Sequence, residues 1–158
     1  IGWQNPSLEA EKELKTMDTN AVGFTRLVGC AYRYFANNGG GHIACITSIA
    51  GTKGLGPAPA YSASKAMQNT YLQALEQLAI SKHHNIHFTD IRPGFVDTPL
   101  LAGSSRLPML MTTEKVARSI LKAVNCRRHV CVIDTRWAVL TFLWRLIPNW
   151  IWRRMKLC

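Results

Sequence analysis

Three short apolar runs, separated by longer stretches with helical spacing, make up the hydrophobic pattern of the chain. The runs cover residues 42–48 (HIACITS), 86–92 (IHFTDIR) and 129–133 (HVCVI). Each has the length and the β-branched content of a strand, and the first is typical of a strand buried on both faces. Pro93-Gly94 follows the second run directly and predicts that this strand ends there.

The remaining apolar positions recur with helical spacing. Ser7 is expected to cap a short acidic turn over 8–15, and a longer helix is expected over 17–36, ending at the Asn- and Gly-rich residues 37–41. In that helix four apolar residues lie near one face: Val22, Leu27, Ala31 and Tyr34. Further helices are expected over 60–82, from Thr112 or Thr113 to Asn125, and over 135–158 with a break at Pro148.

A strand–helix–strand–helix–strand order is typical of parallel βαβ units with right-handed crossovers. The sequence therefore predicts an α/β fold with a three-stranded parallel sheet and helices on both faces. Such a sheet leaves one edge open. We expect an earlier half of a doubly wound sheet to dock there, because the chain begins at Ile1 in what reads as the middle of a loop.

The net charge of the chain is +10, from 19 basic and 9 acidic side chains. Half of it lies in residues 136–158, which hold five basic residues, no acidic residue and four of the five tryptophans. No basic-aromatic strand face or recognition helix is evident, so we predict no nucleic-acid partner. Residues 136–158 are instead expected to form an aromatic, basic helical tail, separate from a domain over 1–135.

The five cysteines include no C-x-x-C pair and do not match the usual zinc spacings, so no metal site is predicted. We expect them to be reduced and the protein to be cytoplasmic. No apolar run is long enough for a membrane-spanning helix.

Tyr61 and Lys65 form a Y-x-x-x-K pair on the helix predicted after the first strand. A spacing of four places both side chains on one helix face. Ser48 stands at the carboxyl end of that strand, and 93–98 (PGFVDT) follows the carboxyl end of the next one. Ligands of open α/β sheets bind beyond these ends, so the residues are expected to face one crevice. Asn20 adds an amide within an otherwise apolar helical stretch.

Ser48, the YSASK run 61–65, the PGFVDT run 93–98 and the N-x-x-G run 20–23 together resemble the short-chain dehydrogenase/reductase family, in order and in spacing. The similarity extends over roughly 1–133. The family's T-G-x-x-x-G-x-G nucleotide loop is absent from the sequence. The resemblance thus implies the C-terminal portion of one Rossmann-like domain, with the nucleotide-binding portion expected upstream.

The resemblance implies an oxidoreductase that interconverts a secondary alcohol and a carbonyl with NAD or NADP. Tyr61 would be the general acid/base, because nearby Lys65 stabilises a phenolate whose reference pKa is near 10. Ser48 would polarise the carbonyl, and Asn20 would hold a water in a proton relay from Lys65. The cofactor contacts implied by the family are Tyr61, Lys65, Pro93, Gly94, Val96 and Thr98.

The implied partners are a small carbonyl or alcohol substrate and a second copy of the chain. By analogy 55–59, Phe95 and 100–110 line the pocket mouth, and their apolar character favours an apolar substrate. Family members commonly pair through the two long helices, here 17–36 and 60–82, which implies a homodimer or homotetramer.

Two alternatives remain open from the sequence. The tail over 136–158 either lies in a membrane interface, which would make the protein membrane-associated, or packs on its own domain or a second subunit. The whole chain is either an enzyme or a non-enzymatic membrane-surface or partner-binding module that retains the oxidoreductase skeleton.

Overall fold

The computed structural model of the chain describes residues 4–101 and 107–156. Its order of elements is α1 (Ala10–Met17), η1 (Asp18–Gly23), α2 (Phe24–Asn37), β1 (Gly41–Ile46), η2 (Ile49–Thr52), α3 (Pro59–Ser81), β2 (Ile86–Arg92), η3 (Pro99–Leu101), α4 (Thr113–Asn125), β3 (Val130–Val132), α5 (Thr135–Leu146) and α6 (Asn149–Trp152).

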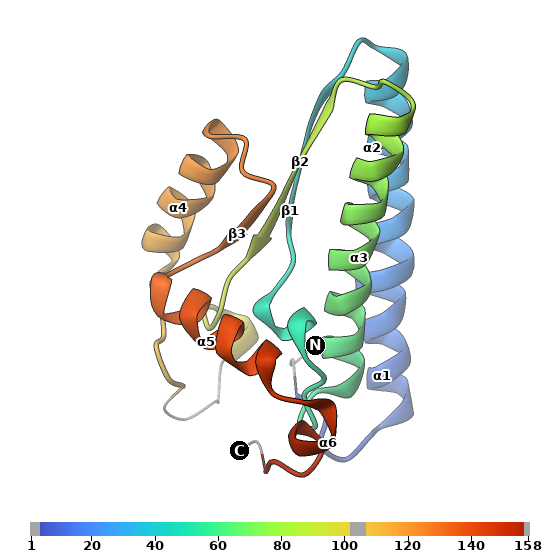
Figure 1. The fold of residues 1–158 in the computed structure, drawn as a ribbon. Coiled ribbons are helices and arrows are strands. Elements are labelled where there is room, and N and C mark those ends of the chain that lie inside the picture. Colours follow the sequence, from blue (N-terminus) through green and yellow to red (C-terminus); the bar gives the residue numbers. More distant parts are fainter. Residues whose placement is uncertain (1–3, 102–106, 157–158) are drawn as a thin grey trace.

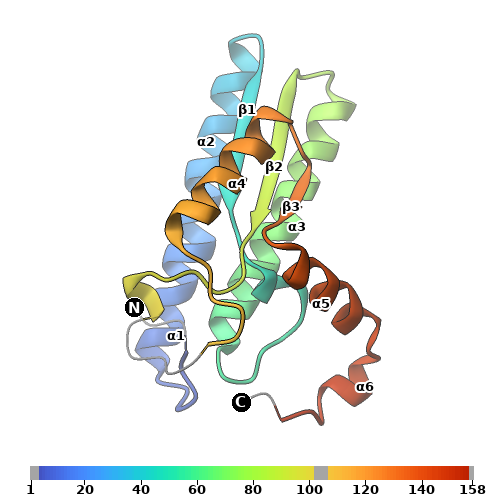
Figure 2. The same ribbon diagram turned by 90° about the vertical axis from the view of Figure 1, so that its left-hand side faces the viewer.

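The three strands form one parallel sheet in the order β1-β2-β3, as the sequence predicts. The chain is thus α/β with a Rossmann-like parallel sheet. Figure 1 shows the sheet between two helical layers, with α2 and α3 side by side on one face and α4 on the other. The view at right angles shows α5 and α6 beyond the lower end of β3 (Figure 2).

Two apolar cores hold these layers together. On the α2–α3 side, Val28, Leu72 and Phe88 belong to a cluster that joins both helices to the sheet. On the α4 side, Ile91, Met111, Val116, Ile133 and Trp137 form a second cluster. Trp137 belongs to the tail, so the first turn of α5 is part of this core. The division at residue 135 stays a prediction.

The helices predicted over 8–15 and 17–36 are one continuous helical run, because the π-helical turn η1 joins α1 to α2 without a break. Ser7 does not cap it: the residue before α1 is Glu9, and the Ser7 hydroxyl bonds the side chains of Asn5 and Glu9. The Asn5 oxygen, not Ser7, accepts from the Glu9 N–H. An amide two residues earlier in the chain thus supplies the acceptor that Ser7 was expected to provide.

The apolar face noted over 17–36 is not the buried one, and the first strand is not buried on both faces. Leu27 and Tyr34 are 73% and 62% exposed, whereas Val28 and Tyr32 face the sheet. In β1, Ile46 is 56% exposed. Ile46 borders a cavity at the carboxyl end of β1, and of the strand's six residues only Ile43 is fully buried.

Two helix boundaries match the expectation. Thr112 caps α4 by accepting a hydrogen bond from the Lys115 N–H at 3.3 Å. α5 and α6 are separated at Pro148, as the break in the pattern predicts. Among the described residues no helix is long and apolar enough to cross a bilayer, and Cys30, Cys45, Cys126 and Cys131 are free thiols.

Candidate active site

A cavity of about 450 Å³ opens beyond the carboxyl ends of β1 and β2. The structure places there the sequence-predicted residues Ser48, Tyr61, Lys65, Pro93, Gly94, Val96 and Thr98. They come from three separate segments: the turn after β1, the first two turns of α3 and the loop after β2. Asn20 is not part of the cavity wall.

Close backbone approaches bring these segments together. A Cβ on Gly51, in η2, would lie 2.6 Å from the backbone carbonyl of Lys65, so a larger residue would push Ser48's turn away from α3. The Ile49 N–H donates to the Pro93 carbonyl at 3.2 Å and joins the same turn to the loop after β2. That loop is in turn held by Met111, whose N–H donates to the Phe95 carbonyl at 3.0 Å.

Tyr61 lies in the first turn of α3, and its phenol interacts with the Ser48 hydroxyl. Burial raises the pKa of Tyr61, and the hydrogen bond with Ser48 opposes this shift. The Ser48 oxygen also accepts from the Ala50 N–H at 3.1 Å, which fixes the side chain at the cavity wall. A hydroxyl and a phenol thus meet at one point, as carbonyl activation and proton transfer require.

Lys65 lies one helical turn further along α3, with its ammonium 5.8 Å from the centre of the Tyr61 ring. The ammonium donates to the Gln68 amide oxygen at 3.1 Å and to the Ile46 carbonyl at 3.4 Å. Burial lowers the pKa of Lys65 to about 8, against the opposing influence of Asp90 and Cys45. A charged Lys65 favours the phenolate of Tyr61 electrostatically.

Asn20 lies in η1, where it makes hydrogen bonds to side chains of α3 and does not line the cavity. Its amide nitrogen donates to the Ser64 hydroxyl at 3.2 Å, and its backbone carbonyl accepts from the Gln68 amide at 2.7 Å. The side chain of Gln68 thus connects Lys65 to the backbone of Asn20. The water relay expected at Asn20 stays a prediction. The sequence analysis did not single out Gln68; its position three residues after Lys65 on the same helix was the available signal.

The loop after β2 supplies the backbone wall of the cavity. The Thr98 hydroxyl donates to the Val96 carbonyl at 3.3 Å, which is local turn chemistry. A Cβ on Gly94 would lie 2.3 Å from the indole nitrogen of Trp137, so only glycine allows the loop to approach α5 this closely.

The far wall of the cavity is apolar. It includes five residues from the segments that were expected to line the pocket mouth: Leu55, Pro57, Phe95, Leu101 and Pro108. Residues 102–106 lie outside the described part of the chain. Trp137, Leu140 and Trp144 of α5 complete this wall. Sequence reasoning noted their helical spacing but did not assign them to the pocket, because the spacing indicates an apolar face without saying what covers it.

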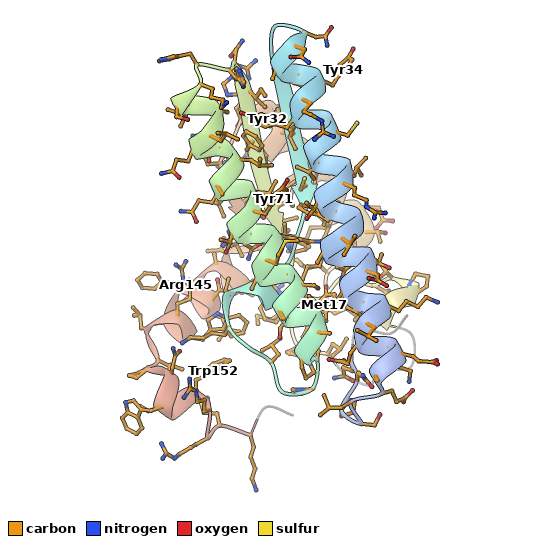
Figure 3. The ribbon with its side chains drawn as sticks, turned by 90° about the vertical axis from the view of Figure 1, so that its right-hand side faces the viewer. Met17, Tyr32, Tyr34, Tyr71, Arg145 and Trp152 are labelled. Atoms are coloured by element: carbon orange, nitrogen blue, oxygen red, sulfur yellow. The ribbon has the colours of Figure 1, made fainter. Side chains whose placement is uncertain are left out.

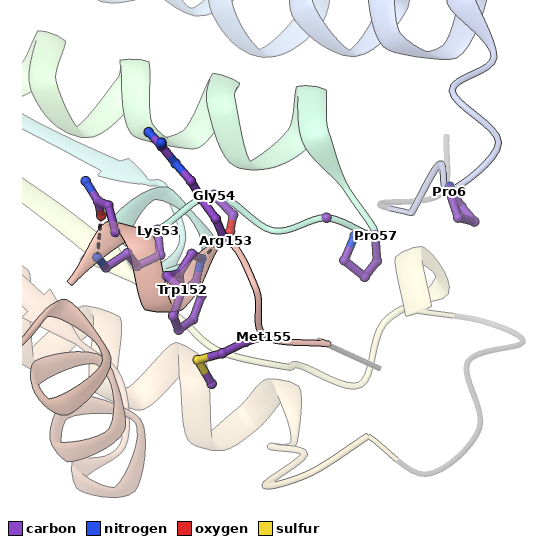
Figure 4. Close-up of a pocket in the computed structure, with 9 residues that line it drawn as sticks. Pro6, Lys53, Gly54, Pro57, Trp152, Arg153 and Met155 are labelled. Atoms are coloured by element: carbon purple, nitrogen blue, oxygen red, sulfur yellow. Dashed lines mark hydrogen bonds between the residues drawn. The ribbon is translucent and has the colours of Figure 1, made fainter. Parts of the chain in front are cut away.

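A second hollow, of about 630 Å³, lies between the loop 53–57 and α6 (Figure 4). Its wall contains Lys53, whose ammonium bonds the Ile147 carbonyl and the Asn149 side chain. None of the predicted catalytic or cofactor-binding residues lines it. The cavity at Tyr61 is therefore the candidate active site.

Comparisons with known proteins identify the family of the chain. The sequence model described as short chain dehydrogenase matches residues 3–107. The chain belongs to the short-chain dehydrogenase family.

Among its curated relatives, an uncharacterized oxidoreductase of Myxococcus xanthus is 29% identical over 136 residues, which are 84% of this chain and 52% of the relative. Sepiapterin reductase of Chlorobaculum tepidum is 29% identical over 110 residues, 68% of this chain and 44% of that protein. The chain thus spans about half the length of these curated relatives.

A solved short-chain dehydrogenase from Burkholderia cenocepacia in complex with NADP superimposes with a TM-score of 0.82 at 18% identity, covering all of this chain and 67% of that one. At this identity the likeness shows the fold.

Proposed function

We propose that the protein is an NAD(P)-dependent oxidoreductase that interconverts a secondary alcohol and a ketone or aldehyde. The observation that carries the proposal is the meeting of Ser48, Tyr61 and Lys65 in one cavity beyond the strand ends. Family membership supports oxidoreduction as the reaction class. The solved relatives that hold NADP or NADPH support a nicotinamide cofactor.

The donor set of the cavity fits the nicotinamide end of such a cofactor. Lys65 offers an ammonium for a ribose hydroxyl, and the loop from Pro93 to Thr98 offers backbone groups and a hydroxyl. The cofactor, when bound, supplies or accepts a hydride. Every other part of the reaction falls to the side chains of this chain.

In carbonyl reduction the Ser48 hydroxyl donates a hydrogen bond to the substrate oxygen and polarises it. Tyr61 gives its phenolic proton to the oxygen as negative charge develops there. Lys65 stabilises the phenolate that remains. In alcohol oxidation the same groups act in reverse, with the phenolate of Tyr61 taking the hydroxyl proton.

The cavity wall favours an apolar substrate. Leu55, Phe95, Trp137, Leu140 and Trp144 surround the reacting groups and offer few hydrogen bonds to a sugar-like substrate. Burial of apolar substrate area against these side chains would supply the binding free energy.

The proposal is tested in the full-length protein by titrating NADH and NADPH separately and following nicotinamide fluorescence. Reduction of a panel of apolar and polar ketones is then measured by loss of the reduced nucleotide. Tyr61→Phe is expected to lower kcat by about 10²- to 10⁴-fold and to weaken nucleotide binding far less, because the other expected cofactor contacts remain.

Tyr34→Phe, at an exposed tyrosine of α2, is the matched control and should keep full activity. Absence of nucleotide binding, or a Tyr61→Phe variant with more than a tenth of the activity, would contradict the proposal. A preference for hydrophilic sugars would contradict its substrate class. Failure of all nucleotide binding would favour the alternative, a non-enzymatic module that retains the family's skeleton.

We also propose that the protein forms a homodimer or homotetramer through its long helices. The exposed apolar residues of α2 and α3, among them Leu27 (73%) and Ile80 (70%), support this. Tyr34, labelled in Figure 3, adds an exposed aromatic ring on α2. Leu27→Glu is expected to shift the mass measured by light scattering towards the monomer.

A further inference from the structure

Helix α5 has two apolar faces, and only one of them is buried. Trp137 and Thr141, one turn apart, are 3% and 4% exposed. On other sides of the helix lie Val139, Phe142, Leu143 and Leu146, which are 54%, 64%, 53% and 65% exposed. Their spacing of i, i+3, i+4, i+7 makes them one continuous stripe. A helix packed on its own domain needs one apolar stripe, so the second stripe lacks an explanation within the described fold.

α6 continues the same arrangement. Trp152 is 8% exposed, and its indole N–H donates to the Gly54 carbonyl at 2.8 Å. Lys53 holds the turn before α6 through the Ile147 carbonyl at 2.9 Å, and Figure 4 shows Trp152 turned towards this loop. Trp150, by contrast, is 64% exposed. The inward residues thus hold α6 in place while its other side chains face solvent.

We call the exposed apolar set the outer tail surface; it consists of Val139, Phe142, Leu143, Leu146, Trp150, Ile151 and Met155. Figure 3 shows α5 and α6 standing apart from the α2–α3 layer, with Arg145 and Trp152 labelled. Seven exposed apolar side chains within 17 residues of sequence are more than scattered surface positions would give.

The charges that accompany this surface are all positive. Arg145, Arg153, Arg154 and Lys156 are exposed, and residues 135–158 contain no acidic side chain. Within the described part of that range, Arg136 alone makes an ion pair, with Asp134. The guanidinium of Arg154 lies 5.9 Å from the ring centre of Trp150, so a cation and an exposed aromatic side chain are neighbours.

We propose that the outer tail surface docks on an anionic lipid bilayer. An exposed aromatic and aliphatic stripe beside uncompensated cations matches the boundary between acyl chains and anionic headgroups. α5 has 12 residues, so it is about 18 Å long and would lie along the surface rather than span a hydrocarbon core of about 30 Å.

A second copy of the chain fits the same surface less well. In a two-fold dimer the same patch meets itself, so the four cations of one copy would face those of the other. No acidic side chain of the tail could neutralise them. An anionic bilayer covers the apolar stripe and neutralises the cations together.

Docking would also bring the active-site cavity to the membrane. Leu140 lines that cavity and is 37% exposed, on the same helix as the outer stripe. An apolar substrate dissolved in the bilayer would then reach the cavity past α5. This consequence rests on the proposed oxidoreductase function, whereas the docking surface itself does not.

The test is co-sedimentation of the full-length protein with vesicles of phosphatidylcholine alone and of phosphatidylcholine mixed with phosphatidylserine. Binding is expected to the anionic vesicles, with weaker binding to neutral ones and at high salt. The double variant Phe142→Glu/Leu146→Glu should bind at least tenfold more weakly, and so should Arg153→Glu/Arg154→Glu. Leu121→Glu, at a 62% exposed leucine of α4, is the control and should bind as the unchanged protein.

Each variant is first compared with the unchanged protein by circular dichroism and thermal unfolding; the outward positions should tolerate charge. If the unchanged protein does not bind, or if Phe142→Glu/Leu146→Glu binds equally well, the proposal is overturned. It is also overturned if that variant dissociates an oligomer in light scattering and no vesicle binding is seen. The assay needs neither nucleotide nor turnover, so its failure is distinct from failure of the catalytic proposal.

Discussion

The ammonium of Lys65 donates a hydrogen bond to the amide oxygen of Gln68, 3.1 Å away. Gln68 is only 3% exposed, and its amide nitrogen donates to the Asn20 carbonyl at 2.7 Å. One buried amide therefore connects the proposed catalytic lysine to the π-helical turn η1. In the proposed mechanism Lys65 must be charged to stabilise the Tyr61 phenolate, so we expect Gln68 to contribute by positioning Lys65.

Gln68→Leu is expected to remove one of the two acceptors that the Lys65 ammonium contacts and so to lower the pKa of Lys65 further. In carbonyl reduction, the fall of kcat/KM at high pH should then begin at lower pH than in the unchanged enzyme. Gln68→Glu should move it to higher pH, because a carboxylate favours the charged lysine.

Gln73→Leu, at an exposed glutamine of the same helix, is the matched control and should leave the pH profile unchanged. Equal profiles for all three variants would show that Gln68 has only a packing role.

Lys65 should also make stability depend on pH. Its pKa is about 8 in the folded chain and 10.5 ordinarily, so between these values the unfolded chain binds more protons. The contribution of Lys65 to the free energy of unfolding should therefore rise with pH over this window, by roughly 3 kcal/mol in full. Above pH 9 the raised pKa of Cys45, about 11, acts in the opposite direction, so the contribution of Lys65 is the difference between the unchanged protein and Lys65→Met. Urea denaturation of the nucleotide-free protein at several pH values measures the slope.

Lys65→Met should lose this slope, and Lys82→Met, at an exposed lysine just after α3, should keep it. A slope that persists in Lys65→Met would assign it to another group.

Asp90 is a buried carboxylate, 3% exposed, in the middle of the sheet. It accepts hydrogen bonds from the Thr47 hydroxyl and, at 2.8 Å, from the Arg92 guanidinium. Asp90→Asn would leave the partly buried charge of Arg92 without its counter-ion. We expect a loss of about 3 kcal/mol in the free energy of unfolding.

The same change should lower the pKa of Lys65, because Asp90 is one of the groups that raise it. Glu11→Gln, at an exposed position of α1, should cost less than about 0.5 kcal/mol and serves as the control for loss of one charge. A loss below about 1 kcal/mol for Asp90→Asn would mean that water replaces the carboxylate.

Gly94→Ala should destabilise the protein because a Cβ there would overlap the indole of Trp137, 2.3 Å away. Trp137 is 3% exposed and contacts Phe95 edge-on, so it has little room to move. Overpacking of this kind costs about 1 to 3 kcal/mol. When Trp137 is already replaced by leucine, Gly94→Ala should cost less free energy of unfolding. Urea denaturation of the unchanged protein, the two single variants and the double variant measures this difference. If the losses in the free energy of unfolding are additive, the two residues do not interact.

The strands, most helix ends and the Ser48–Tyr61–Lys65 grouping could be predicted because they depend on local signals. The 86–92 run matches β2 to the residue, and Pro93-Gly94 explains its end. Tyr61 and Lys65 share a helix face because of their spacing alone. Ser48 and the loop from Pro93 join them because parallel strands of one sheet end on the same side.

The sequence pattern could not predict which of two apolar faces is buried. It indicated a face with Val22, Leu27, Ala31 and Tyr34, yet in α2 the buried residues are Val28 and Tyr32. For α5 it left open whether the aromatic residues meet a membrane or the domain. The structure divides them, with Trp137 in the core and Phe142 exposed.

The sequence by itself thus determined the order of elements, the parallel sheet and the family's reactive side chains, since periodicity and turn residues act over a few neighbouring positions. Only the tertiary structure decided that Gln68 links Lys65 to Asn20, that α5 closes the cavity, and that its second stripe faces outward. These relationships join residues up to some 90 positions apart, such as Thr52 and Trp144. Their physical basis is the packing of whole elements, which no local pattern contains.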